Sequence, residues 1–308
     1  MKAGQWVKLG QMYCPTGQDR HPKLASHAAN PVPVHQFEDT YRIFFSGRDV
    51  QNRSSVGAVD FDLVKKRVIR EHRTPFFEFG PEGSFYSHGV SIGNCYDAGG
   101  VTYLPFMGWQ NLEGSHWRGD IGRLIVNPDL TLKLDSSVPM MASDVTDPLS
   151  LSYPWVRKAE NGGFDMWYGS TVKWDAGNSE MLHVINYAHS SDGHVWRREG
   201  QAVPHEIGVA QAFSRPVVMR DAEGRFEMWF SYRRGNGDTY RIGHATSLNG
   251  KVFALDLSNA GIDVATDGWD SEMIEYPFVL DHRGHRYMFY NGNGYGRTGF
   301  GMAVLTRG

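Results

Sequence analysis

Glu275 is the side chain of this sequence best suited to proton transfer. It stands directly before Tyr276-Pro277, at the start of an apolar run that continues to Leu280. A carboxylic acid beside aromatic rings has a raised pKa, because burial disfavours its charged form, so it can act as an acid near neutral pH. Chemistry that needs both an acid and a base commonly requires a second such group. Asp49, at the end of another apolar segment, is the second candidate.

Polar and aromatic side chains occupy matching places in several similar segments of the chain. They stand just before a proline, or at the equivalent place, and are Asn30, His88, Tyr153, Arg215 and Tyr276. The proline and the apolar run after it would be enough to form a strand, so this chemical variety indicates substrate binding. The alternative is that these side chains hydrogen-bond to one another at a wet opening.

A second layer of candidates stands near the ends of the second strands. Its members are Trp109, Trp174, Asp175, Arg233 and Asn291, and a further candidate, Glu272, lies on the crossing into the fifth copy. Aromatic side chains of this kind can stack on a sugar ring, although packing on neighbouring residues is an alternative. Arg233, like Arg48 and Arg215, suits a carboxylate, sulfate or phosphate, because guanidinium binds such groups bidentately. A salt bridge to a nearby acid is the structural alternative for each arginine, and capping of a loop is the alternative for Glu272.

The segments that carry these residues form an internal repeat. Each copy has an apolar strand, a polar turn and a second strand rich in aromatic residues, and the copies begin near residues 29, 87, 152, 214 and 275. Most copies continue through a polar loop into a third strand and a turn such as Asp192-Gly193 or Asn249-Gly250. Asp-Gly and Asn-Gly are strong hairpin signals, so a fourth strand is expected after them. The second copy lacks the proline.

This repeat predicts an all-β fold. Four-stranded antiparallel units in series are typical of a β-propeller, here with five blades in a single domain of residues 1–308. The last copy ends with its third strand, so we expect residues 5–9 to supply the fourth and close the ring. The long connections then lie on the face where the first strands begin, and the candidate residues surround a central funnel on that face.

Composition excludes several classes of partner. The chain has 308 residues and a net charge of -3, which gives no reason to expect nucleic acid or an anionic membrane. No apolar run is long enough to span a bilayer. Two cysteines argue against a disulfide framework, and the N-terminus lacks the apolar core of a signal peptide, so we expect a cytoplasmic protein. Neither a metal-ligand spacing nor a phosphate loop is present, so no metal and no cofactor are expected.

The repeated units, together with the segment Tyr187–Trp196, resemble the five-bladed β-propeller glycosidase superfamily. This superfamily includes glycoside hydrolase families 43, 62, 32, 68 and 130, and the resemblance covers almost the whole chain. It implies a carbohydrate-active, glycoside hydrolase-like enzyme that acts on a small-molecule or oligosaccharide substrate. In these families a Glu just ahead of a Pro acts as general acid, and Glu275-Tyr276-Pro277 matches that motif. The acidic residue that heads the first blade in these families is Asn30 here.

Since asparagine cannot act as base or nucleophile, the resemblance leaves three readings. Glu275 and Asp49 form a rearranged catalytic pair, for which a carboxyl separation of about 5 Å favours retention and roughly 6.5–9.5 Å favours inversion. Alternatively, the reaction is phosphorylase-like, with phosphate as the nucleophile and an anionic ligand at the arginines. The third reading is a non-catalytic carbohydrate-binding propeller.

Overall fold

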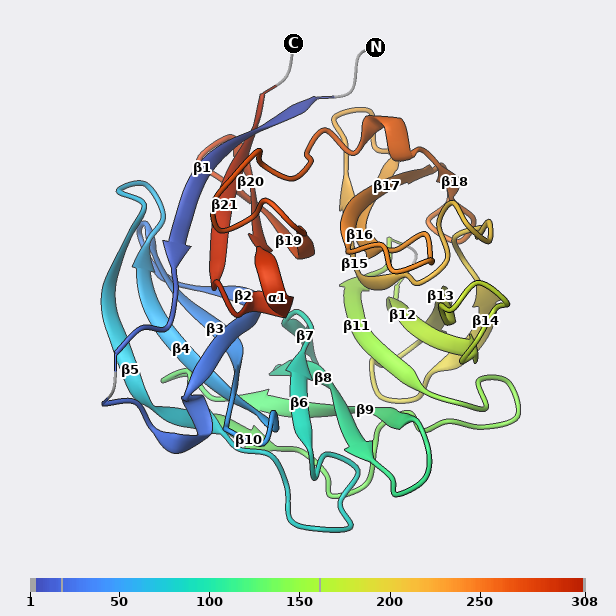
Figure 1. Ribbon diagram of the computed structural model, residues 1–308, viewed down its shortest axis with the longest axis horizontal. Helices are drawn as coiled ribbons and strands as arrows, with labels where there is room; N and C mark the ends of the chain where they lie inside the picture. Colours follow the sequence, from blue (N-terminus) through green and yellow to red (C-terminus); the bar gives the residue numbers. More distant parts are fainter. Residues whose placement is uncertain (1–3, 18, 161, 307–308) are drawn as a thin grey trace.

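The computed structural model describes residues 4–17, 19–160 and 162–306, and the chain is built almost entirely of β-strands. The strands lie in sheets arranged around a common centre (Figure 1). Short helical turns occur at η1 (Pro22–Leu24), η2 (Leu257–Asn259) and α1 (Asn293–Gly296). Within these described residues, no helix has the length and apolar character that crossing a membrane requires.

Both ends of the chain contribute to the same four-stranded sheet. Its order is β1 (Gln5–Tyr13), β21 (Phe300–Thr306), β20 (His285–Asn291) and β19 (Glu275–His282). β1 pairs antiparallel with β21, from Gln5 opposite Thr306 to Tyr13 opposite Phe300. The prediction that residues 5–9 complete the last unit is therefore confirmed, and the pairing extends further than the prediction.

The third and fourth repeat units each form a separate four-stranded antiparallel sheet in chain order. The third contains β11 (Leu151–Lys158), β12 (Phe164–Lys173), β13 (Leu182–Ser190) and β14 (Arg197–Gln201). The fourth contains β15 (Ser214–Arg220), β16 (Phe226–Tyr232), β17 (Arg241–Ser247) and β18 (Ala254–Leu255). Neighbouring strands in sequence are neighbours in space, as the turn signals predicted.

The first two repeat units share one nine-stranded sheet. Its strands are β2 (Ser26–Phe37), β3 (Thr40–Arg48), β4 (Ser54–Asp62), β5 (Arg67–Phe77), β6 (Gly89–Ile92), β7 (Tyr96–Ala98), β8 (Val101–Asn111), β9 (Trp117–Val126) and β10 (Leu132–Leu134). One parallel pair, Ser54 with Gly89, joins β4 to β6. On either side of this link the strands pair antiparallel, so the predicted all-β propeller of four-stranded antiparallel units is confirmed.

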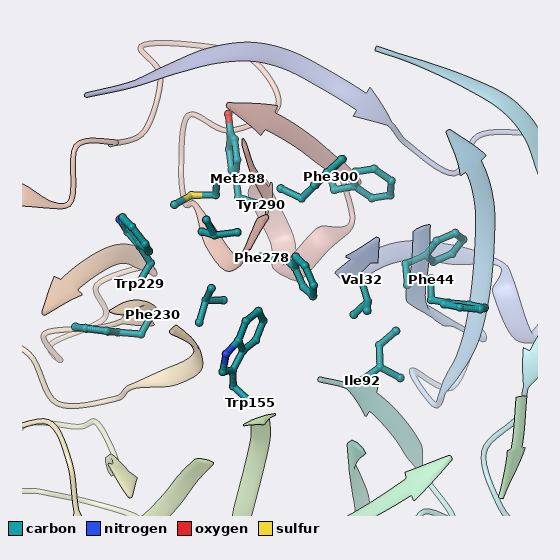
Figure 2. Packing of buried hydrophobic residues seen from close by; sticks show 14 of the residues in the cluster. Val32, Phe44, Ile92, Trp155, Trp229, Phe230, Phe278, Met288, Tyr290 and Phe300 are labelled. Carbon is teal, nitrogen blue, oxygen red and sulfur yellow. The ribbon is translucent and has the colours of Figure 1, made fainter. Parts of the chain in front are cut away.

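The apolar core fills the space between the sheets. Side chains from the first strands of different sheets, among them Val32, Ile92, Trp155 and Phe278, point toward the centre of the molecule (Figure 2). The rings of Trp155 and Phe278 meet edge to face with centroids 5.2 Å apart. Burial of one such side chain contributes about 1.5–3 kcal/mol, so contacts between sheets hold the first strands in place. The beginnings of these strands surround the candidate site.

Candidate active site

Two adjacent hollows lie where the first strands begin. Their volumes are about 200 Å³ and about 290 Å³. The walls of both include Arg48, Met107, Trp117, Tyr153 and Tyr276. Because they share these side chains, we treat them as one cavity with two parts. The smaller is called the Asn30 compartment and the larger the His183 compartment.

The heads of four first strands, beside the cavity, have backbone in an uncommon conformation. The residues before the four prolines, Asn30, Tyr153, Arg215 and Tyr276, have φ angles of 54°, 36°, 45° and 52°. Strand pairing skips at the same places, for example between Ser152 and Trp155 in β11. A left-handed conformation is costly for residues other than glycine, and such strain is often found at functional sites. The resulting bulges take these side chains out of the regular alternation of the strand.

The Asn30 compartment is lined by small polar side chains and by Trp109. Asn30 is buried, and in the described part of the chain its Oδ1 has no hydrogen-bond partner. Trp109 Nε1 donates to Ser54 Oγ at 3.2 Å, which fixes the indole in the wall. Ser91, from β6, completes this side. The compartment therefore offers an unused amide oxygen beside an aromatic surface.

The His183 compartment contains an anchored arginine. Arg233 Nη2 donates to Glu180 at 2.8 Å, and the guanidinium lies 4.6 Å from the centre of the Tyr240 ring. A further contact of 3.3 Å joins Arg233 Nη1 to the Tyr295 hydroxyl. Ser214, at the head of β15, also lies in this wall, and within the described residues its Oγ has no partner. This compartment therefore combines a cation, aromatic rings and an unused hydroxyl.

Glu275 lies at the head of β19, at the position that Ser152 and Ser214 occupy in their sheets. It is completely buried, and among the described residues neither carboxyl oxygen has a hydrogen-bond partner. Burial raises the pKa of Glu275 well above its usual value, although the positive charges of Arg233 and Arg48 oppose this. This shift favours the protonated form of the carboxyl, which is the form that can serve as an acid.

The charge of Glu275 affects three tyrosines of the cavity wall. Burial, followed by the charge of Glu275, raises the pKa of Tyr276 well above its usual value. Tyr153 and Tyr240 also have raised pKa values, mainly because of burial, with Glu275 as a further cause. Tyr153, Tyr240 and Tyr276 all line the cavity, and Tyr276 follows Glu275 directly in β19, so Glu275 is adjacent in sequence to a wall residue.

Asp49, the predicted second carboxylate, does not line either compartment. Its Oδ2 accepts from Arg53 Nε at 2.8 Å, and its Oδ1 accepts from the backbone N–H groups of Gln51 and Arg53 at 2.9 and 2.8 Å. Arg48 lines the cavity, whereas the side chain of Asp49 forms hydrogen bonds within the loop that follows β3. Asp49 is therefore held within this loop and is not part of the cavity wall.

Of the predicted binding residues, five line the cavity: Asn30, Trp109, Tyr153, Arg233 and Tyr276. Arg215 has the same backbone position as Tyr153 and Tyr276, but its guanidinium is used by the scaffold. It donates to Ile92 O at 2.6 Å, Pro31 O at 2.9 Å and Pro277 O at 3.3 Å, so it ties together three first strands. Burial lowers the pKa of Arg215 to about 9. The predicted role of Arg215 in anion binding is not supported.

Asn291 is likewise a scaffold residue. It is completely buried, and its Oδ1 accepts from the backbone N–H of Asn30 at 2.8 Å. Its Nδ2 donates to Ala28 O and to Gly299 O, both at 2.7 Å. These contacts hold the last sheet against the head of β2, so no polar atom of the amide is left for a ligand.

His88 lies outside the cavity wall because the second repeat unit has no proline bulge. β6 pairs with β8 without a skip, from Gly89 opposite Trp109 to Ile92 opposite Phe106. The residue that reaches the wall is consequently Ser91.

The remaining predicted binding residues lie in loops beside the cavity. The ring of Trp174 stacks on His116 at 4.5 Å and meets Trp117 edge-on at 5.1 Å, so it supports the wall from behind. Asp175 accepts from the backbone of Gly177 at 2.8 Å. Glu272 is exposed, and its backbone carbonyl accepts from Thr239 at 2.6 Å.

Several wall residues were not among the predicted ones. Three of them, Trp117, His183 and Tyr240, stand at or next to the beginning of a third strand. The same repeat that located the heads of the first strands could have located these positions. Met107 and Phe213 carry no comparable signal, since an apolar residue in a strand is normally part of the core.

Solved structures share the fold of this chain. One is a glycoside hydrolase with a TM-score of 0.76 and 12% identity, matched over 99% of this chain and 93% of that one. Another comes from work on the GH130 family of mannoside phosphorylases and on its glycoside hydrolases that target β-1,2 mannosidic linkages (TM-score 0.71, 11% identity, 98% and 94% covered). An endo-arabinase from Bacteroides thetaiotaomicron has a TM-score of 0.62 at 14% identity, with 94% and 97% covered. The protein thus shares its fold with these solved structures, and at these identities the likeness concerns the fold alone.

No protein-family model matches the sequence. Two Mycobacterium tuberculosis sequences, the uncharacterized proteins Rv1502 and MT1551, are each 44% identical to this chain over 302 residues. The matches cover 97% of this chain and 99% of each relative. The chain belongs to the same family as these two proteins.

Proposed function

We propose that this protein is a carbohydrate-active enzyme, a single five-bladed domain that binds a glycosyl substrate in the cavity and uses Glu275 as proton donor. The observation that carries the proposal is the state of Glu275, a completely buried carboxylic acid without a hydrogen-bond partner among the described residues. A buried polar group that lacks partners is costly for stability. Ionisable groups with strongly shifted pKa values in a cavity are typical of active sites.

The proposed reaction is glycosyl transfer to phosphate. Asp49, the predicted partner of Glu275, is held in its own loop, and within the described residues the cavity wall offers no other carboxylate as base or nucleophile of two-carboxylate hydrolysis. Phosphate can replace it, because a phosphate oxygen attacks the anomeric carbon while the bond to the leaving oxygen breaks. That leaving oxygen takes the proton of Glu275. Arg48 supports this reading, since its guanidinium-bearing side chain lines both compartments.

A non-catalytic carbohydrate-binding propeller is the second candidate. It is favoured by one observation, that Glu275 has zero exposure and is not among the residues that line the cavity. A binding protein would need the aromatic and polar wall but no proton donor.

The experiment is a panel of p-nitrophenyl glycosides assayed with and without inorganic phosphate, in which the sugar product is identified as free sugar or glycosyl phosphate. We expect phosphate-dependent turnover, loss of at least about 100-fold in Glu275→Gln, and retained binding of the glycoside. Glu272→Gln, outside the cavity, is the matched control and should keep full activity. Turnover by Glu275→Gln at the wild-type rate would contradict the role of Glu275. Binding without turnover by the wild type would favour the second candidate.

A further inference from the structure

Three hydrogen-bonded side chains form a short relay at the wall of the His183 compartment. Ser152 Oγ lies 2.6 Å from His183 Nε2, and Thr171 Oγ1 lies 2.7 Å from His183 Nδ1. The three residues come from β11, β13 and β12, which are adjacent strands of the third sheet. All three are buried, and Ser152 and His183 contribute to the cavity wall. The relay therefore ends at the ligand space.

Gly169 makes this arrangement sterically feasible. A Cβ at this position would come within 2.1 Å of Ser152 Oγ and 2.3 Å of His183 Nε2. The equivalent residues of other second strands are Ser46, Ser231 and Asn291. Their side chains hydrogen-bond to the backbone of a neighbouring first strand. Only without a side chain at this position can His183 reach across β12 to Ser152.

Thr171 determines which ring nitrogen of His183 carries the proton. The Thr171 residue is completely buried, and in the described part of the chain its hydroxyl has His183 Nδ1 as its one hydrogen-bond partner. A buried hydroxyl proton without an acceptor is costly, so Thr171 donates to Nδ1. The neutral ring then carries its proton on Nε2 and donates to Ser152 Oγ. As a result, the proton of Ser152 itself is not used within the relay.

The surroundings keep His183 neutral. Burial, followed by the positive charge of Arg233, lowers the pKa of His183 to about 3. Its backbone is also fixed, because its N–H donates to Gln211 O at 3.1 Å and its carbonyl accepts from Phe213 N at 2.9 Å. The ring therefore has one orientation and one charge state across the physiological pH range.

We propose that His183 is a positioning residue that fixes Ser152 as a hydrogen-bond donor to an acceptor oxygen of the ligand. The suitable ligand group is a hydroxyl, ring or acidic oxygen of a glycosyl compound, and a group that only donates hydrogen bonds is disfavoured at this point. This deepens the proposed function and rests on it for the identity of the ligand. The direction of the relay does not depend on any activity.

The first test is the tautomer of His183 in protein labelled with ¹⁵N-histidine, read from two-bond ¹H–¹⁵N correlation spectra. We expect Nε2 to carry the proton and Nδ1 to carry none, without change between pH 5 and pH 8. Thr171→Ser should preserve this pattern, and Thr171→Val should alter it. The spectrum of His183→Gln, in which one signal is missing, assigns the signal of His183. If that variant does not fold, the change caused by Thr171→Val gives the assignment. A proton on Nδ1 in the wild type would overturn the proposal, because Ser152 would then donate to the ring.

The second test measures the dissociation constant of the best-binding p-nitrophenyl glycoside of the panel. Loss of one hydrogen bond in Ser152→Ala should weaken binding about 3–10-fold. Thr171→Val should weaken it in the same direction, and Thr171→Ser should restore it. Ser247→Ala, at the end of β17 and outside the cavity wall, also removes a buried hydroxyl; it is the matched control and should bind as the wild type does.

The outcomes separate the two proposals. Wild-type affinity in Ser152→Ala would overturn the donor role of Ser152. Weaker binding in Ser152→Ala but not in Thr171→Val would overturn the positioning role of His183. If no glycoside binds, the proposed function fails, whereas the tautomer still decides the direction of the relay.

Discussion

The third and the last sheets place equivalent residues beside the cavity and use them in opposite ways. In the last sheet Glu275 pairs across the strands with Asn291, and in the third sheet Ser152 pairs with Gly169. Glu275 has no hydrogen-bond partner among the described residues, whereas Ser152 is held by His183 at 2.6 Å. The same backbone therefore presents an isolated acid in one sheet and an oriented hydroxyl in the other.

The residue on the second strand accounts for much of this difference. Asn291 directs its amide to the backbone of Asn30, Ala28 and Gly299, so it stabilises the scaffold and gives Glu275 no partner. Gly169 has no side chain and so makes no such hydrogen bond, and the space beside it is taken by His183 of the third strand, β13. An isolated buried acid has a shifted pKa, while a partnered hydroxyl has a defined direction. One position thus separates a group suited to proton transfer from one suited to recognition.

The largest effect on stability should follow from Asn291→Ala, which removes the side chain that holds the last sheet against β2. Three buried hydrogen bonds are lost, and we expect the free energy of unfolding to fall by about 2–4 kcal/mol in urea denaturation. Ser231→Ala removes one hydrogen bond, to Tyr276 N, and should cost about 1 kcal/mol. Equal losses in the two variants would show that the extra contacts of Asn291 contribute nothing.

Gly169→Ala should have the next largest effect, because it makes the third sheet resemble the others. The added methyl group overlaps Ser152 Oγ and His183 Nε2, so the free energy of unfolding should fall by about 1–3 kcal/mol. In the double variant with Ser152→Ala the overlap is partly relieved, so the loss should be smaller than the sum of the two single losses. Strictly additive losses would contradict the steric role of Gly169.

The smallest effect on stability is expected for Glu275→Gln. The difference in Tm between this variant and the wild type should be least at acidic pH and should grow as the pH rises. The pKa of Glu275 is raised in the folded protein, so its contribution to stability is present below the unfolded pKa and is lost as the pH rises through the folded pKa. Glutamine does not titrate, so the Tm of the variant should fall less than that of the wild type between pH 5 and pH 8.5. Thermal unfolding at a series of pH values measures this.

The control for this pH series is Glu272→Gln, which changes an exposed carboxylate. Its Tm should follow the wild-type pH dependence. Parallel curves for Glu275→Gln and the wild type would contradict the burial of an ionisable carboxyl at the head of β19.

The strands were predictable because their signals are local. The apolar run after Glu275 and its turn correspond to β19 and β20, and comparable runs correspond to the other first and second strands. The second unit was the hardest to read, since its first strand is divided into β6 and β7 and lacks the proline. That same lack explains why the wall residue is Ser91 and not His88.

The site was predictable only in part. Tyr153 and Tyr276 were identified because they share the bulged position before a proline, where the side chain leaves the strand alternation. Arg215 shares that position too, yet its long side chain reaches carbonyl groups of three other first strands. Sequence position indicates where a side chain starts, but not whether it ends in the cavity or in the scaffold.

The sequence by itself determined the repeat, the strand order and the residues at the heads of the first strands, because these depend on neighbours along the chain. The tertiary structure decided their partners. Ser152 meets His183 across 31 residues, and Arg215 meets Pro31 across 184. Such contacts depend on how twisted sheets pack around a common centre and on the space that Gly169 leaves, and no local pattern records either. For that reason the acid at Glu275 was visible in the sequence, while the absence of Asp49 from the cavity wall and the relay to Ser152 were not.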